Sequence, residues 1–150
     1  MTHPRFTDDA AIDALVAGLR ARTLPVADFT HHAHVAATSW FLERHSIDAA
    51  TCLLRSGIAV YNELCGPGNR VDGGYHETLT LFWIGAVAHH RARQDPRDPL
   101  HVRVVALLAG DLGRSDYPRD FYSGDRLMSQ AARARWVGPD RRPLPWSWPL

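Results

Sequence analysis

The segment YHETLTLFWIGAVAHHRA, residues 75–92, is apolar on nearly every side when it is placed on a helix. A surface helix carries its apolar residues on one stripe, whereas a helix that is apolar all round is normally surrounded by other elements. Eighteen residues also exceed the usual length of a β-strand. The segment therefore predicts a buried, central helix against which the rest of the chain packs.

Apolar periodicity and capping residues predict further helices on both sides of this segment. The expected helices cover residues 7–22, 30–45, 48–65, 75–92, 98–109 and 123–136, and residues 137–150 are expected to form an extended tail. Thr7, Asp48 and Asp98 are the expected caps of the first, third and fifth helices. The tail is too rich in proline for a helix, and Trp146 and Trp148 suggest that it packs onto the domain. The predicted fold class is an all-α, single-domain bundle of about six helices.

Length and composition limit the function classes. The chain has 150 residues, 45% of them hydrophobic and 22% charged, with a formal net charge of +1, which is typical of one soluble domain. Near-neutral charge and the absence of a known binding motif argue against a nucleic-acid partner, and no apolar run is long enough to span a membrane. Cys52 and Cys65 form no disulfide framework, and no apolar signal core follows Met1. We therefore expect a cytoplasmic protein.

Two short motifs supply side chains suited to proton transfer and metal ligation. FTHHAH (residues 29–34) and YHET (residues 75–78) each open a predicted helix. If consecutive helices alternate in direction, helices 30–45 and 75–92 start at the same end of the bundle, where the glycine-rich loop 66–74 also leads. The sequence therefore predicts a pocket at one end of the bundle, built by His31, His34, His76 and Glu77.

Three interpretations of this set remain open. In the first, His31 and His34 lie on one helical face and bind zinc or non-haem iron together with His76 and Glu77, although HxxH is a weak motif. In the second, burial favours the uncharged forms of these groups, which then act as acid and base without a metal. In the third, the histidines cap backbone groups and Glu77 pairs with Arg70, Arg91 or Arg133. Tyr75, Thr80 and Trp83 are candidate substrate contacts beside His76.

Three motifs together resemble a family of small, uncharacterised, all-helical bacterial proteins. They are FxHxxHV from Phe29, YHETxTxFW from Tyr75 and SxxARxxWVxPD from Ser129, and the likeness extends from about residue 29 to residue 144. The resemblance implies that Ser129, Arg133 and Trp136 belong with the histidine site, where Arg133 would bind an anion. It implies no particular reaction.

The leading hypothesis is a small-molecule enzyme, with His76 and Glu77 as acid/base groups or metal ligands and His31 and His34 as ligands or substrate donors. The alternative is a non-catalytic binding or accessory protein that uses the same pocket. A third class is an interaction module that uses Trp40 or the tail tryptophans, and an outward-facing Trp40 needs a neighbouring helix or a second subunit of a homodimer.

Overall fold

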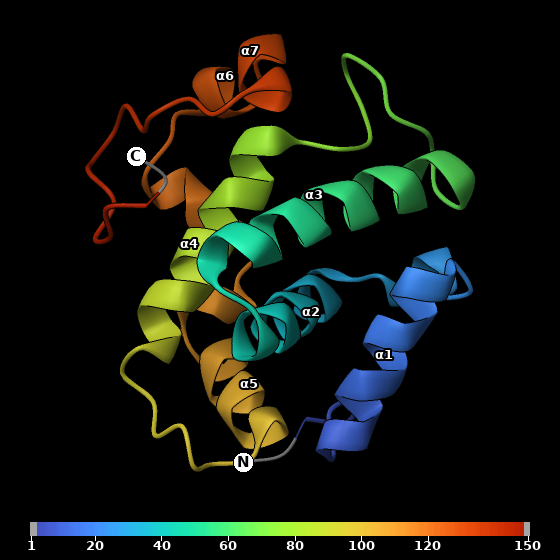
Figure 1. Cartoon of the computed structure of the whole chain (residues 1–150). Helices are drawn as coiled ribbons and strands as arrows, with labels where there is room; N and C mark the ends of the chain where they lie inside the picture. Colours follow the sequence, from blue (N-terminus) through green and yellow to red (C-terminus); the bar gives the residue numbers. More distant parts are fainter. Residues whose placement is uncertain (1–2, 149–150) are drawn as a thin grey trace.

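A computed structural model describes residues 3–148, which are helical apart from loops and one isolated β-bridge between Arg70 and Gly73. The long helices are α1 (Asp9–Ala21), α2 (His31–Arg44), α3 (Ile47–Leu64), α4 (Glu77–Arg91) and α5 (Leu100–Ala109) (Figure 1). Two short helices follow, α6 (Gly124–Leu127) and α7 (Gln130–Ala134), together with 3-10 turns at Val26–Asp28, Asp111–Gly113 and Tyr117–Asp120. The all-α, single-domain prediction is confirmed. No helix within residues 3–148 is long and apolar enough to cross a membrane.

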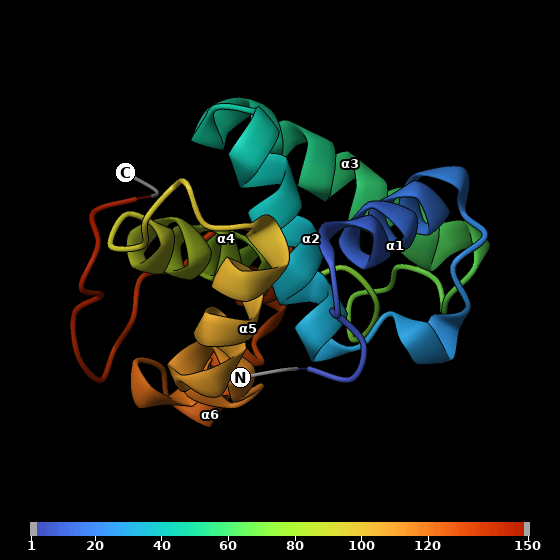
Figure 2. The same ribbon diagram turned by 90° about the horizontal axis from the view of Figure 1, so that it is seen from below.

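The centre of the bundle is shared by α2 and α4. Figure 2 shows α2 between α1 and α3 on one side and α4 and α5 on the other, and α2 contacts all four. Small residues make this possible, since Ala33, Ala36, Ala37 and Ser39 are buried and let the neighbouring backbones approach closely. The buried position of α4 agrees with its apolar sequence, whereas the central position of α2 was not predicted.

Helices α1 and α3 begin at caps other than the expected ones. The side chain of Asp8, rather than Thr7, accepts a hydrogen bond from the Ala11 amide of α1. Ser46, rather than Asp48, caps α3, and Asp48 instead lies in its first turn, where a carboxylate is also favourable. Neighbouring residues compete for one cap position, so sequence places a helix start only to within one or two residues.

Helix α5 begins with a cap supplied from a distant part of the chain. Asp98 and Pro99 precede it, but neither side chain caps the helix. The carboxylate of Asp9, in the first turn of α1, accepts hydrogen bonds from the amides of Leu100 (3.3 Å) and His101 (2.8 Å). This cap joins α1 to α5 at their N-terminal ends, and local sequence gives no sign of it.

The predicted helix 123–136 is wrong in its middle, where α6 ends and α7 begins. The Ser129 hydroxyl donates to the carbonyl of Arg126 (2.8 Å) and accepts from the amide of Ala132 (3.1 Å). Serine side chains compete with the helical backbone in this way and favour helix starts. One serine therefore divides the segment into two helices of four and five residues.

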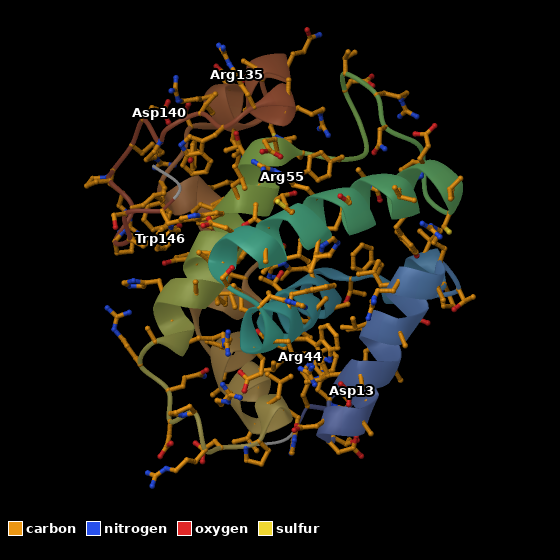
Figure 3. All side chains as sticks on the ribbon, viewed as in Figure 1. Asp13, Arg44, Arg55, Arg135, Asp140 and Trp146 are labelled. Carbon is orange, nitrogen blue, oxygen red and sulfur yellow. The ribbon has the colours of Figure 1, made fainter. Side chains whose placement is uncertain are left out.

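Trp40 does not face solvent without a partner. Its indole N–H donates to the Asp13 carboxylate of α1 (2.6 Å), and the Arg44 guanidinium stacks over its ring at 4.1 Å. Arg44 also pairs with Asp13, and Figure 3 shows these two side chains converging between α1 and α2. The neighbour that Trp40 needs is thus α1 of the same chain.

The tail, described over residues 137–148, has no helix and bends at residues 140–142 and 145–146, and it packs onto α4. The Trp146 ring lies against Phe82, Phe121 and His89, with ring centroids 5.3, 6.0 and 5.6 Å away. A Cβ at Gly85 would lie 2.5 Å from the indole nitrogen of Trp146, so only glycine leaves room for the tail here. Residues 149–150 of the predicted tail lie outside the described residues.

Thr78→Val is expected to destabilise the protein by about 2 kcal/mol, because two buried backbone groups lose their partner. The Thr78 hydroxyl donates to the Arg135 carbonyl (2.8 Å) and accepts from the Val137 amide (3.1 Å), and the residue is fully buried. Urea unfolding measures the change. Thr51→Val is the matched control, since its hydroxyl bonds only the Ile47 carbonyl one turn away, and we expect little change there. Equal losses of stability in both variants would contradict the idea that Thr78 joins α4 to residues 135–137.

Candidate functional site

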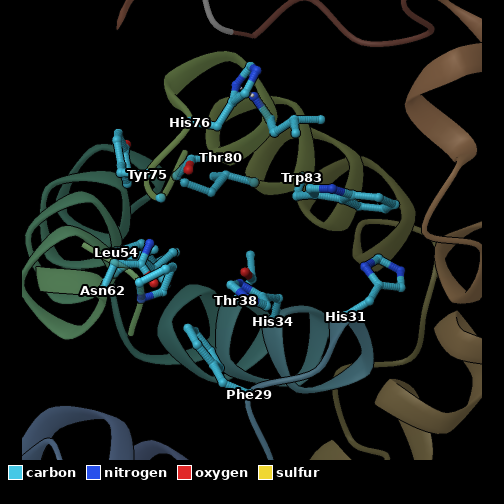
Figure 4. A pocket seen from close by; sticks show the side chains of 15 residues that line it. Phe29, His31, His34, Thr38, Leu54, Asn62, Tyr75, His76, Thr80 and Trp83 are labelled. Carbon is cyan, nitrogen blue, oxygen red and sulfur yellow. Dashed lines mark hydrogen bonds between the residues drawn. The ribbon is translucent and has the colours of Figure 1, made fainter. Parts of the chain in front are cut away.

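A cavity of about 440 Å³ lies between α2, α3, α4 and the loop that precedes α4 (Figure 4). Its volume is in the range of small-molecule sites. The residues that line it are Phe29, His31, His34, Thr38, Leu54, Ile58, Asn62, Pro67, Gly74, Tyr75, His76, Leu79, Thr80, Trp83 and Ile84. Both predicted histidine motifs therefore reach one cavity, together with the candidate contacts Tyr75, Thr80 and Trp83.

His34 is the imidazole available for an external partner. Its ring stacks on Phe29 at 3.8 Å between centroids and borders the cavity from α2. Within residues 3–148, neither ring nitrogen has a hydrogen-bond partner. Desolvation by the surrounding protein, helped by nearby His31, lowers the pKa of His34 to about 4. At pH 7 the ring is neutral and offers one donor and one acceptor.

His31 contributes one free nitrogen. Its Nε2–H donates to the carbonyl of Leu112 at 2.8 Å, which leaves Nδ1 of the neutral ring as an acceptor. The ring lies against Trp83, with centroids 4.5 Å apart. Burial lowers the pKa of His31, and the Leu112 carbonyl opposes this shift only in part. His31 therefore borders the cavity as a second neutral imidazole.

His76 is engaged at both nitrogens. Its Nδ1 accepts from the Leu79 amide (3.2 Å) and thereby caps α4, and its Nε2–H donates to the Leu127 carbonyl of α6 (2.9 Å). Burial is the main cause that lowers its pKa, which favours the neutral ring this arrangement requires. The arrangement matches the structural interpretation, in which a histidine caps a helix. It also leaves neither nitrogen free to act as an acid, a base or a metal ligand.

Glu77 lies outside the cavity lining. Both oxygens of its carboxylate have partners in the protein: Oε1 accepts from the Arg55 guanidinium of α3, and Oε2 accepts from the Tyr75 hydroxyl at 2.6 Å. Burial and this hydrogen bond raise the pKa of Tyr75. The partner of Glu77 is thus Arg55 rather than Arg133, because α3 crosses the start of α4. Glu77 joins these two helices and does not face a ligand.

The predicted four-ligand metal set does not come together. Across the described residues 3–148, no group of three or more histidine, cysteine, aspartate or glutamate side chains is arranged to hold a metal ion. The physical reason lies in the partners just described: His76 points to Leu127, and Glu77 points to Arg55. Only His31 and His34 of the set keep a free nitrogen beside the cavity.

Arg133 and Ser129 support the site without lining it. The Arg133 guanidinium donates to the carbonyls of Gly74 (3.1 Å) and Tyr75 (3.2 Å), so it fixes the loop at the edge of the cavity. Ser129 separates α6 from α7, as described above. Arg133 was expected to bind an anion, but its guanidinium instead binds the backbone of the loop.

The glycine-rich loop that borders the cavity has a defined conformation. Asn69 accepts from the Tyr75 amide (2.9 Å) and donates to the Ala59 carbonyl (2.7 Å). Gly74 has φ +76°, and a Cβ there would meet the Gly68 carbonyl at 2.2 Å. Glycine is thus required at residue 74, and the loop forms a wall of the cavity.

The α3 wall of the cavity was missed from sequence. Leu54, Ile58 and Asn62 follow one another at intervals of four residues and all face the cavity. This spacing places them on one face of a helix, so the pattern was present in the sequence. Phe29 and Thr38 were also missed as lining residues, although both lie beside the histidines of α2.

The pKa of His34 predicts a pH dependence of stability. In the unfolded chain His34 binds a proton near pH 6.5, whereas the folded protein does so only near pH 4. The unfolded state therefore binds more protons in this interval, and stability falls as the pH is lowered from 6.5 to 4. The size-matched variant His34→Leu should show a shallower decline in urea unfolding. If the free energy of unfolding fell as steeply with pH in His34→Leu as in wild type, the low pKa of His34 would be contradicted.

A scan against protein-family models, a search of curated proteins and a search of solved structures each returned no match for this chain.

Proposed function

We propose that this protein binds a small molecule in the cavity between α2, α3 and α4, with His34 as its main hydrogen-bonding contact. The observation that carries the proposal is a neutral, half-buried imidazole that borders a cavity of about 440 Å³ and has no partner among the described residues. Buried polar groups in proteins normally have hydrogen-bond partners. A ligand that supplies such partners should bind favourably, because the protein groups it contacts are already in position before binding.

Binding is favoured over catalysis by the chemistry of the free groups. His76 and Glu77, the expected acid/base pair, are held by Leu127 and Arg55. A histidine whose pKa is about 4 is a weak base at pH 7, whereas a general base works best when its pKa is near the operating pH. His34 is therefore better suited to orient a ligand than to remove a proton from it.

An enzyme that uses the same cavity is the second candidate, favoured by the presence of both His31 and His34 at its wall. A neutral imidazole can donate a hydrogen bond to a reacting carbonyl and so polarise it. The two candidates differ in the expected result of replacing His34. In a binding protein the change weakens affinity, whereas in an enzyme it abolishes turnover and leaves much of the binding intact.

The test is a fragment screen by ¹H–¹⁵N correlation spectra on wild type, His34→Leu, His34→Gln and His45→Ala. We expect fragments to shift the amides of cavity residues, with at least about tenfold weaker affinity in His34→Leu and partial recovery in His34→Gln, which keeps a donor and an acceptor. His45 is exposed at the other end of α2 and serves as the matched histidine control.

Stability separates a ligand-binding His34 from a structural one. Because His34 has no hydrogen-bond partner within residues 3–148, His34→Leu should unfold at the same or a higher temperature than wild type. A histidine that stabilises the fold would give the opposite result. Fragments that bind His34→Leu as tightly as wild type, or that shift only residues outside the cavity, would overturn the proposal.

A further inference from the structure

The cavity is bordered by uncharged side chains. Among its fifteen lining residues there is no aspartate, glutamate, lysine or arginine. The two charged residues that were expected at the site are engaged elsewhere, Glu77 with Arg55 and Arg133 with two backbone carbonyls. An ion that enters such a cavity leaves water without gaining an opposite charge, which is strongly unfavourable.

The histidines do not supply a positive charge either. Burial lowers the pKa of His31, His34 and His76, so all three rings favour their neutral forms at pH 7. The groups in direct contact with these rings include the carbonyls of Leu112 and Leu127 and the aromatic rings of Phe29 and Trp83, all of them uncharged. Arg133, which faces His76 from α7, carries a positive charge and disfavours its protonated form.

The remaining walls are apolar and partly flat. Figure 4 shows Phe29 and His34 on the α2 side of the cavity and Trp83 on the α4 side. The Phe29 and His34 rings stack with an angle of 23° between their planes, so each ring covers one face of the other and presents its remaining face and its edge to other contacts. Leu54 and Ile58 complete the apolar wall on α3. Aromatic walls of this kind interact well with a ring.

The free polar atoms require both kinds of hydrogen-bonding group on the ligand. His31 Nδ1 is an acceptor, because its Nε2–H is held by Leu112. Neutral His34 offers one donor and one acceptor, and the Thr38 hydroxyl beside it can act as either. A ligand that fits these atoms both donates and accepts.

From these observations we infer that the cavity takes an uncharged ring compound that carries a hydrogen-bond donor and an acceptor, and that it discriminates against ions of either sign. This inference rests on the proposed small-molecule function and specifies the chemical class of its ligand. It differs from the expectation of an anionic substrate held by Arg133.

Three probes with one ring system and different charge test the inference. Indole-3-acetamide is neutral at pH 7, indole-3-acetate is an anion and tryptamine is a cation. Each is titrated into ¹⁵N-labelled wild type, and the shifts of the Gly74 amide and the Trp83 indole N–H are followed, because both residues line the cavity. The same titrations on His34→Leu and His45→Ala show whether the shifts depend on the cavity histidine.

We expect the neutral amide to bind at least tenfold more tightly than either ion, with the preference reduced in His34→Leu and retained in His45→Ala. Binding of an ion at the cavity with equal or higher affinity than the amide would overturn the inference while leaving the small-molecule function in place. Absence of cavity shifts with all three probes would overturn the inference for ring compounds. The small-molecule function itself is judged separately, on the wider fragment screen.

Discussion

Phe82→Ala is expected to lower the free energy of unfolding by about 3–5 kcal/mol, the usual cost of truncating a fully buried phenylalanine. The Phe82 ring is fully buried, and five aromatic rings from α4 and the C-terminal segments pack around it. They belong to Trp83, Tyr117, Phe121, Tyr122 and Trp146, whose centroids lie 5.3–6.2 Å from that of Phe82. Urea unfolding followed by circular dichroism measures the loss.

The matched control is Val102→Ala on α5, where the side chain is 45% exposed. This variant removes apolar atoms from a helix without opening a cavity, so the change should stay within about 0.5 kcal/mol. Trp146 packs directly on Phe82, so Phe82→Ala should also weaken the attachment of the tail to α4. If Phe82→Ala cost no more than Val102→Ala, the aromatic cluster would not be the core that joins α4 to the C-terminal segments.

Glu43→Gln is expected to cost about 2 kcal/mol, because one partly exposed carboxylate holds two arginines that are themselves shielded from solvent. Oε1 of Glu43 accepts from Arg103 at 2.7 Å, and Oε2 accepts from Arg91. The Arg103 side chain is only 6% exposed, so its charge is left poorly compensated once the carboxylate is removed. The three residues tie α2, α4 and α5 together at the end of α2 remote from His31.

The same cluster predicts acid sensitivity. The hydrogen bond from Arg103 lowers the pKa of Glu43, so the folded protein binds this proton at lower pH than the unfolded chain. The stabilisation is therefore complete above the ordinary glutamate pKa and is lost as the pH falls through the lower, folded value. The free energies of unfolding of wild type and Glu43→Gln, measured at a series of pH values, should therefore become equal towards low pH. Asp72→Asn, at a pair with Arg70 in which both side chains are mostly exposed, is the control and should leave the pH dependence of stability unchanged. A Glu43→Gln profile that runs parallel to that of wild type would contradict the account.

The sequence was sufficient to predict the fold class and that the two histidine motifs meet. An apolar segment at residues 75–92 indicated a buried helix, and two histidine motifs at helix starts indicated where side chains with reactive groups would meet. The spacing of apolar residues indicates which faces of a helix are buried, so such predictions can be made without knowing which distant residues are in contact. The cavity beside His31, His34 and His76 follows from the same reasoning.

The roles within the site could not be predicted, because each is decided by a partner far away in the chain. His76 is engaged since the Leu127 carbonyl lies beside it, and Glu77 is engaged since Arg55 crosses the start of α4. His34 is free because its neighbour on the cavity wall is the Phe29 ring, which offers no hydrogen bond. Of two histidines at the cavity, one thus caps a helix and the other has no hydrogen-bond partner within residues 3–148, according to their tertiary contacts.

The central claim is that His34 is the group that meets the ligand, and the ring-nitrogen chemical shifts of the histidines test it most directly. Long-range ¹H–¹⁵N spectra are recorded on the free protein and on protein saturated with the tightest-binding fragment. We predict a neutral His34 ring at pH 7 whose nitrogen shifts change on binding, while those of His76, held by Leu79 and Leu127, stay constant. Unchanged His34 nitrogens in a saturated complex would contradict the account.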